Sequence, residues 1–164
     1  MEAREIFPPW RCRCIVEKFR DRTARERGEP YEVLESEGNL ALNQGLNYIW
    51  SRVCAGSGAA LDGANAHLGV GDSSAAADAT QTGLQAATNK LYKAVDPGYP
   101  TYGTEQQVTL KATFSEAEAN FAWEEWTVAN GNSDAAVNLN RKVESKGTKP
   151  SGEIWTLSAV LTLQ

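Results

Sequence analysis

The last third of the chain shows the most regular alternation of apolar and polar residues, which is the pattern of strands with one buried face. One such segment runs over residues 108–114, and a longer one runs over residues 154–163. A further strand is expected over 137–143, after the strong turn signal Asn130-Gly131. The apolar members of the two alternating segments are Val108, Leu110, Ala112 and Phe114, and Trp155, Leu157, Ala159, Leu161 and Leu163.

Between these strands, the tryptophans of residues 121–128 do not keep a single face. Strict alternation puts Trp123 on one side of a strand and Trp126 on the other. This change of face predicts either a β-bulge near Glu124-Glu125 or a strand that is covered on both sides.

Near the N-terminus, the segment Trp10 to Glu17 predicts a half-buried strand, with Trp10, Cys12, Cys14 and Val16 on one side. A second short strand is expected from Tyr31 to Glu35, so the charged stretch between them is predicted to be a hairpin tip. That stretch has no large aliphatic side chain with which to order itself. It is therefore interpreted either as a solvated loop or as a tether whose arginines pair with carboxylates on a neighbouring subunit.

After this hairpin, helical spacing of Leu42, Leu46, Ile49 and Val53 predicts an amphipathic helix. Asn39 is expected to cap its start and Gly56 to end it. The predicted fold class is mainly β: an antiparallel β-sandwich or barrel-like body with one principal amphipathic helix and an extended N-terminal arm or hairpin. Two regions are expected, a charged N-terminal strand or arm over 1–38 and the helix plus sandwich body over 39–164.

Composition and charge narrow the function classes. The 164 residues have no apolar run long enough for a membrane span and no signal-peptide pattern at the start, which predicts a soluble protein kept in the cytoplasm. A net charge of −5 argues against nucleic-acid binding, which depends on neutralising phosphates. Residues 1–35 carry eight basic and eight acidic side chains, so the acidic excess belongs to the remainder.

Candidate catalytic, metal and cofactor residues are scarce. The sequence has one histidine, His67, between two apolar neighbours, and the spacing of Cys12 and Cys14 does not fit a zinc site. No glycine motif has the context of a nucleotide-binding loop. Glu124 and Glu125 are adjacent, so a strand directs them to opposite faces, and they are interpreted as solvated charges. The sequence thus predicts no enzyme, no metal and no cofactor.

Residues 64–164 resemble a widespread family of tailed-bacteriophage virion proteins. The resemblance is carried by the order and spacing of four pieces, HLGVGDSS at 67–74, ATQTGLQA at 79–86, NFAWEEW at 120–126, and NLNRKV at 138–143 followed by WTL at 155–157. Proteins of this kind are described as tail-fibre-like, head-decoration or structural. The resemblance therefore implies a part of the virion, assembled in the cytoplasm of the host bacterium, without fixing its place there.

The absence of repeats and of a heptad stalk favours a capsid decoration (cement) protein over a fibre. The expected partners are the major capsid protein and copies of the chain itself, with a homotrimer suggested by analogy, and neither nucleic acid nor membrane. The alternative is a tail-tip, tail-fibre or receptor-binding component that binds tail proteins, with Trp123 and Trp126 as receptor or glycan contacts. The candidate capsid-interface residues are Trp10, Arg11, Arg13, Arg20, Arg22, Arg25 and Arg27.

Overall fold

The fold is known from a computed structural model that describes residues 10–163. Ten strands and two helices follow one another along these residues. Their order is β1 (Trp10–Phe19), α1 (Arg22–Arg27), β2 (Glu32–Glu37), β3 (Leu40–Ala41), α2 (Asn43–Ala55), β4 (His67–Gly71), β5 (Lys90–Ala94), β6 (Thr101–Tyr102), β7 (Gln107–Phe114), β8 (Ala122–Ala129), β9 (Asn140–Thr148) and β10 (Ile154–Leu163).

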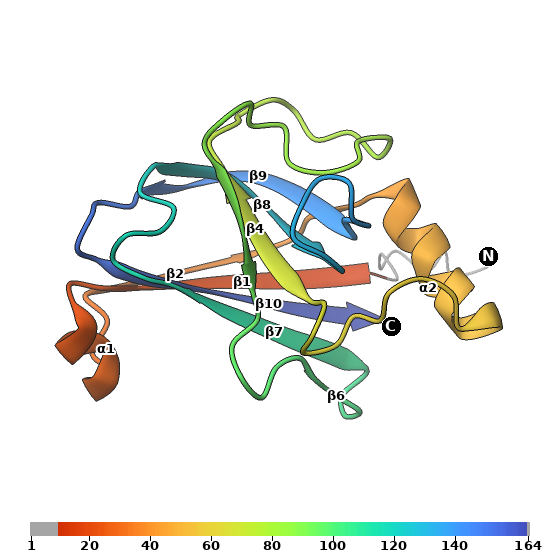
Figure 1. Ribbon diagram of the computed structural model, residues 1–164, viewed down its shortest axis with the longest axis horizontal. Coiled ribbons are helices and arrows are strands. Elements are labelled where there is room, and N and C mark those ends of the chain that lie inside the picture. The colour runs from red at the N-terminus through yellow and green to blue at the C-terminus, as the bar shows by residue number, and fades with distance from the viewer. Residues whose placement is uncertain (1–9, 164) are drawn as a thin grey trace, which may run out of the picture.

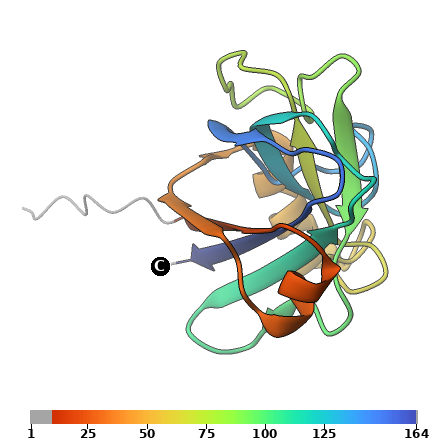
Figure 2. The ribbon, with the colours of Figure 1, turned by 90° about the vertical axis from the view of Figure 1, so that its left-hand side faces the viewer.

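The strands form two five-stranded antiparallel sheets, with the orders β2-β1-β10-β7-β6 and β3-β9-β8-β4-β5. The sheets pack face to face, and α1 and α2 lie at opposite ends of the strands (Figure 1). Seen along the strands from the α1 end, the two sheets form separate layers (Figure 2). The predicted class, a mainly β protein with an antiparallel sandwich body, is confirmed.

Alternate side chains of both sheets fill the space between the layers. Trp123 lies at the centre of this core, with its ring centroid 4.8 Å from Phe114 and 5.0 Å from Trp155, both in edge-to-face geometry. Aromatic pairs of this kind add about 0.5–1.5 kcal/mol beyond the area they bury. The inward faces of β1, β7 and β10 are the ones that alternation predicts.

Strand β8 shows both features that were expected as alternatives. Its pairing with β9 shifts register between Trp123 and Glu125, which is the predicted bulge. The bulge lets Trp123 and Trp126 both enter the core, while Glu125 and Thr127 face the other way and are also buried. The strand is therefore covered on both sides.

The N-terminal region takes the hairpin form rather than that of an extended arm, as far as it is described. β1 pairs with β10 along its whole length and with β2 on its other side. The expectation that the charged stretch stays without order is wrong, because Arg22–Arg27 form a short helix. Asp21 accepts a hydrogen bond of 2.8 Å from the Ala24 amide, and Gly28 ends the helix with φ of 67°. Residues 1–9 of the expected arm lie outside the described residues.

Helix α2 differs from its prediction at the start and agrees at the end. The residue before its first turn is Leu42, which provides no side-chain cap, so the expectation for Asn39 is wrong. The side-chain amide oxygen of Asn39 instead accepts a hydrogen bond of 2.9 Å from the Trp10 indole. Gly56 ends the helix in the left-handed conformation, as predicted. Gly45 is needed for the packing of α2, because a Cβ there would lie 2.5 Å from the carbonyl oxygen of Leu139.

Candidate functional site

Exposed large apolar side chains gather at one end of the sandwich. The described residues include eight exposed large apolar side chains. Two of them, Tyr31 and Val33, belong to the β1–β2 hairpin region instead. The other six lie on α2, just before it, on β6 and at the end of β10 (Figure 1). We call this surface the α2 end and define it by Leu40, Leu46, Trp50, Val53, Tyr102 and Leu163.

Helix α2 has two apolar sides, and only one of them packs against the sheets. Leu42, Gly45 and Tyr48 are buried at its base. Leu46, Trp50 and Val53 follow the spacing i, i+4, i+7 and form an exposed ridge. Trp50 is 66% exposed and Val53 is 71% exposed. The predicted packing face, which included Leu46 and Val53, is therefore wrong for these two residues.

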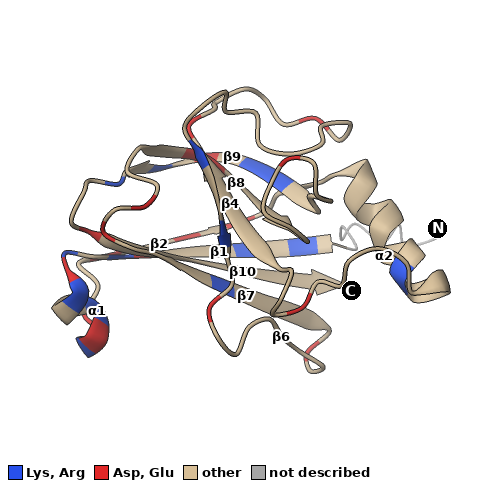
Figure 3. Ribbon diagram, viewed as in Figure 1, with Lys and Arg blue, Asp and Glu red and all other residues tan. Residues whose placement is uncertain are grey.

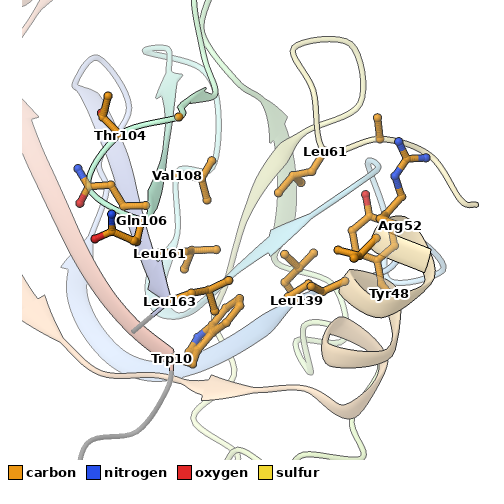
Figure 4. A pocket seen from close by; sticks show the side chains of 15 residues that line it. Trp10, Tyr48, Arg52, Leu61, Thr104, Gln106, Val108, Leu139, Leu161 and Leu163 are labelled. Atoms are coloured by element: carbon orange, nitrogen blue, oxygen red, sulfur yellow. The ribbon is translucent and has the colours of Figure 1, made fainter. Parts of the chain in front are cut away.

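Beside the ridge lies an open apolar cavity of about 770 Å³, lined by residues of α2 and of the ends of both sheets. Figure 4 shows Leu161, Leu163 and Trp10 on one side and Tyr48 with Leu61 on the other. Two hydrogen bonds hold the walls in place. The Tyr48 hydroxyl donates to the Ala59 carbonyl at 2.6 Å, and the Trp10 indole donates to Asn39.

The α2 end carries almost no charge. Arg52 is the one charged residue of α2 and of the cavity lining. Its Nη1 donates to the carbonyl oxygens of Gly56 and Gly58, at 2.7 and 2.9 Å, so the guanidinium is used to hold the end of the helix. Figure 3 shows this contrast with α1, where charged residues are dense.

The α1 end presents arginines that already have partners within the chain. The Arg20 guanidinium lies 4.7 Å from the ring centroid of Tyr31, and the Arg25 guanidinium lies 5.4 Å from that of Phe19. Arg22 pairs with Glu116 at 3.4 Å, and its side chain is 72% exposed. Contacts of this exposed kind contribute little to stability and can be exchanged for others at small cost.

The seven candidate interface residues do not form one surface. Trp10 lines the apolar cavity, whereas Arg20, Arg22, Arg25 and Arg27 lie beyond the other end of β1. A ten-residue strand separates these two groups by roughly 30 Å. Arg11 and Arg13 follow Trp10 on β1, and these three residues together line a second, more polar hollow of about 670 Å³. Arg13 forms an ion pair with Glu35.

The two candidate receptor contacts are not on the surface. Trp123 and Trp126 are each 1% exposed and belong to the core between the sheets. A glycan or receptor can stack only on an accessible indole ring. The interpretation of these two residues as receptor contacts is therefore wrong, because the bulge in β8 lets both of them enter the core.

Glu125 and Arg141 form a buried ion pair that the sequence analysis missed. Both side chains are fully buried, and Arg141 Nε donates to Glu125 at 2.6 Å. The Glu125 carboxylate also accepts hydrogen bonds from the amides of Gln85 and Ala86, and Arg141 Nη1 donates to the Ala75 carbonyl. The pair thus fixes the long loop of residues 72–89 on the outer face of β8 and β9. The interpretation of Glu125 as a solvated charge is wrong.

A second set of polar groups fixes the same loop nearby. The Tyr92 hydroxyl lies 2.5 Å from Asp134, which also accepts a hydrogen bond from the Leu84 amide at 3.1 Å. Asp134 forms an ion pair with Lys90 as well. Burial and the nearby Asp134 raise the pKa of the Tyr92 hydroxyl above its ordinary value. These groups are used in structural hydrogen bonds rather than being directed into a cavity.

The remaining chemical candidates have structural surroundings. His67 is the first residue of β4, and its Nδ1 lies 2.7 Å from the Asn65 carbonyl oxygen. Glu124 accepts a hydrogen bond from Ser145 on the surface and is directed away from the buried Glu125. Over residues 10–163, no cluster of three or more His, Cys, Asp or Glu side chains is arranged to hold a metal ion. Within the same residues, no helix has the length and apolar character to cross a bilayer.

The candidate functional surface that sequence reasoning missed is therefore the α2 end. A signal for it was present, because Leu46, Trp50 and Val53 fall on one helical face while Leu42, Gly45 and Tyr48 fall on another. Two apolar faces on a short helix indicate that one of them is left for a partner. In comparisons with known proteins, no family model, no curated protein and no solved structure matches the chain.

Proposed function

We propose that this chain is a non-enzymatic structural protein of a tailed-bacteriophage virion, where it binds the outside of the major capsid shell and stabilises it. The observation that carries this proposal is the presence of two exposed surfaces of different chemistry at opposite ends of one sandwich. A decoration protein needs such a pair of surfaces, because it must bind both the shell and its own neighbours. The resemblance of residues 64–164 to virion proteins supports the same role.

In this proposal the α1 end contacts the shell. Its arginines pair with surface carboxylates of the capsid protein, giving up weak internal contacts such as that of Arg22 with Glu116. Each contact is weak, but many copies on a symmetric shell act together through their high effective concentration. The apolar α2 end is the second contact surface, because a large exposed apolar patch marks a site of protein association.

The test is the location and copy number of the chain in purified particles. The proposal predicts a fixed ratio to the major capsid protein and density on the outside of the shell in an image of the particle. A chain found in a few copies at the tail, or absent from particles, would contradict it.

A set of variants connects this test to the α1 end. Changing Arg20, Arg22, Arg25 and Arg27 together to alanine is expected to lower the occupancy of the shell, and raising the salt concentration is expected to act in the same direction. The matched control changes the same four residues to lysine, which keeps the charge and should keep most of the occupancy. Full occupancy in the alanine variant would show that the α1 end is not the shell contact.

A further inference from the structure

The ridge and the cavity of the α2 end lie side by side. Trp50 and Val53 project from α2, and the hollow of about 770 Å³ begins at the same helix, since Ile49 and Val53 are part of its wall. A surface that carries both a projection and a hollow can pair with a copy of itself across a twofold axis. An aromatic ridge residue such as Trp50 is also the residue type that dominates binding energy at interfaces.

The area available at this end is close to what a stable pair requires. With the exposed fractions of its six defining residues, the α2 end offers exposed surface on the order of 700 Å², most of it apolar. A standard protein–protein interface buries about 800 Å² on each partner. The α2 end therefore supplies most of one standard interface.

The few charges at the ridge and cavity of the α2 end do not prevent pairing with a second copy. The chain has a net charge of −5, so two copies repel each other over most of their surfaces. The α2 end has a single charged residue in its helix, Arg52, and that guanidinium is already bonded to backbone carbonyls. The helix ridge and the cavity lining of two copies can therefore meet without leaving an unpaired charge of α2 buried, which is the main penalty of burying ionic groups.

We propose that the α2 end pairs with the α2 end of a second copy of this chain. The pair is isologous, so the Trp50 ridge of each copy packs at the cavity of the other. The inference rests on the proposed function only in taking the α2 end as a contact surface. In such a pair the two α1 ends, each opposite α2 in Figure 1, lie away from the contact, at opposite ends of the dimer.

The test uses the full chain and measures its mass by light scattering and sedimentation over a range of concentrations. The wild-type protein is expected to reach the mass of a dimer. Trp50→Lys and Val53→Lys are expected to weaken the association by about thirtyfold or more, because each places a charge in the apolar contact. Both residues are exposed, so circular dichroism and thermal unfolding of the two variants should match the wild type under conditions where all are monomeric.

Val33→Lys is the matched control, because Val33 is 53% exposed and lies on β2, away from the α2 end. It should dimerise like the wild type. A monomer at every concentration, a trimer, or equal weakening by Val33→Lys would overturn the inference.

The failure of this inference is distinguishable from failure of the virion role. If the purified chain is monomeric while particles still incorporate it and lose it on Trp50→Lys, the α2 end binds another virion protein, and the proposed function stands. If the purified chain dimerises through Trp50 but is absent from particles, the pairing stands and the virion role fails.

Discussion

The two ends of the sandwich differ in the chemistry of their exposed side chains. The α2 end is apolar, has few charges and is hollow, whereas the α1 end is dense in arginines and acids, and its arginines have partners within the same chain. Burying an apolar surface in a contact stabilises that contact in proportion to the area buried. Each exposed ion pair, by contrast, stabilises a contact only slightly and is weakened by salt. The α2 end is thus suited to one close partner and the α1 end to many weak contacts.

The ends also differ in how their helices are attached. α2 is held by close backbone approach, with Gly45 against the Leu139 carbonyl and Tyr48 bonded to Ala59. α1 is six residues long and has no buried residue, so it depends on the Asp21 cap and on Gly28 at its end. Changes in these residues should therefore have unequal effects on stability.

The largest expected difference concerns cysteine reactivity. Cys54 is exposed near the end of α2, whereas Cys12 and Cys14 are buried on the inner face of β1. Burial raises the pKa of Cys14 to about 12 and raises that of Cys12 well above its ordinary value. A maleimide should modify Cys54 in the native protein about a hundredfold or more faster than the other two.

Mass spectrometry of the labelled protein over time measures these rates. Cys54→Ser should remove the fast modification, and denaturant should make all thiols reactive. Rapid modification of Cys12 or Cys14 in the native Cys54→Ser protein would show that β1 is not packed as described.

Gly45→Ala is expected to lower the free energy of unfolding by about 1–3 kcal/mol. The added methyl group would collide with the Leu139 backbone, which cannot move without disturbing β9. Denaturant titration followed by circular dichroism measures this loss. Ser51→Ala, an exposed position on the same helix, is the control and should change stability by no more than about 0.5 kcal/mol. An equally small effect of Gly45→Ala would contradict the described attachment of α2.

Asp21→Ala should cost about 1 kcal/mol, because it removes the cap of α1. The effect should be local to residues 22–28, since no residue of α1 is buried. Amide hydrogen exchange measures it as faster exchange of these residues with little change in the sheets. Glu26→Ala in the same helix is the control, and equal exchange in both variants would argue against the cap.

Arg22→Ala alone should change stability by less than about 0.5 kcal/mol, because its contact with Glu116 is exposed. Thermal unfolding at low and high salt measures this effect. A loss of more than about 1 kcal/mol would mean that the α1 arginines hold the fold, and the contrast between the two ends would weaken.

The strands were predictable because alternation directly reflects burial on one face. β7, β10 and the buried side of β1 follow the sequence pattern, and Asn130-Gly131 does separate β8 from the strand that follows. The order of strands in the sheets was not predictable, since it depends on pairings between distant segments. β1 with β10 is such a pairing, and it joins the two ends of the described chain.

The candidate sites were less predictable because they depend on which side chains remain exposed. Periodicity marks Trp123 and Trp126 as apolar but does not reveal that a bulge turns both inward. Likewise, the local sequence predicts a solvated side chain for Glu125, because its partner Arg141 and the loop that covers it come from other segments of the chain. The exposure of Trp50 depends on how α2 packs at Gly45, which helical spacing alone does not fix.

The most direct test of the account is side-chain footprinting of both ends, in the dilute protein, in the concentrated protein and on the particle. The account predicts that Trp50 and Tyr102 become protected in the concentrated protein, and that residues 20–27 become protected only on the particle. Protection of the α1 region without the α2 end, or equal labelling of both ends in all three states, would contradict it.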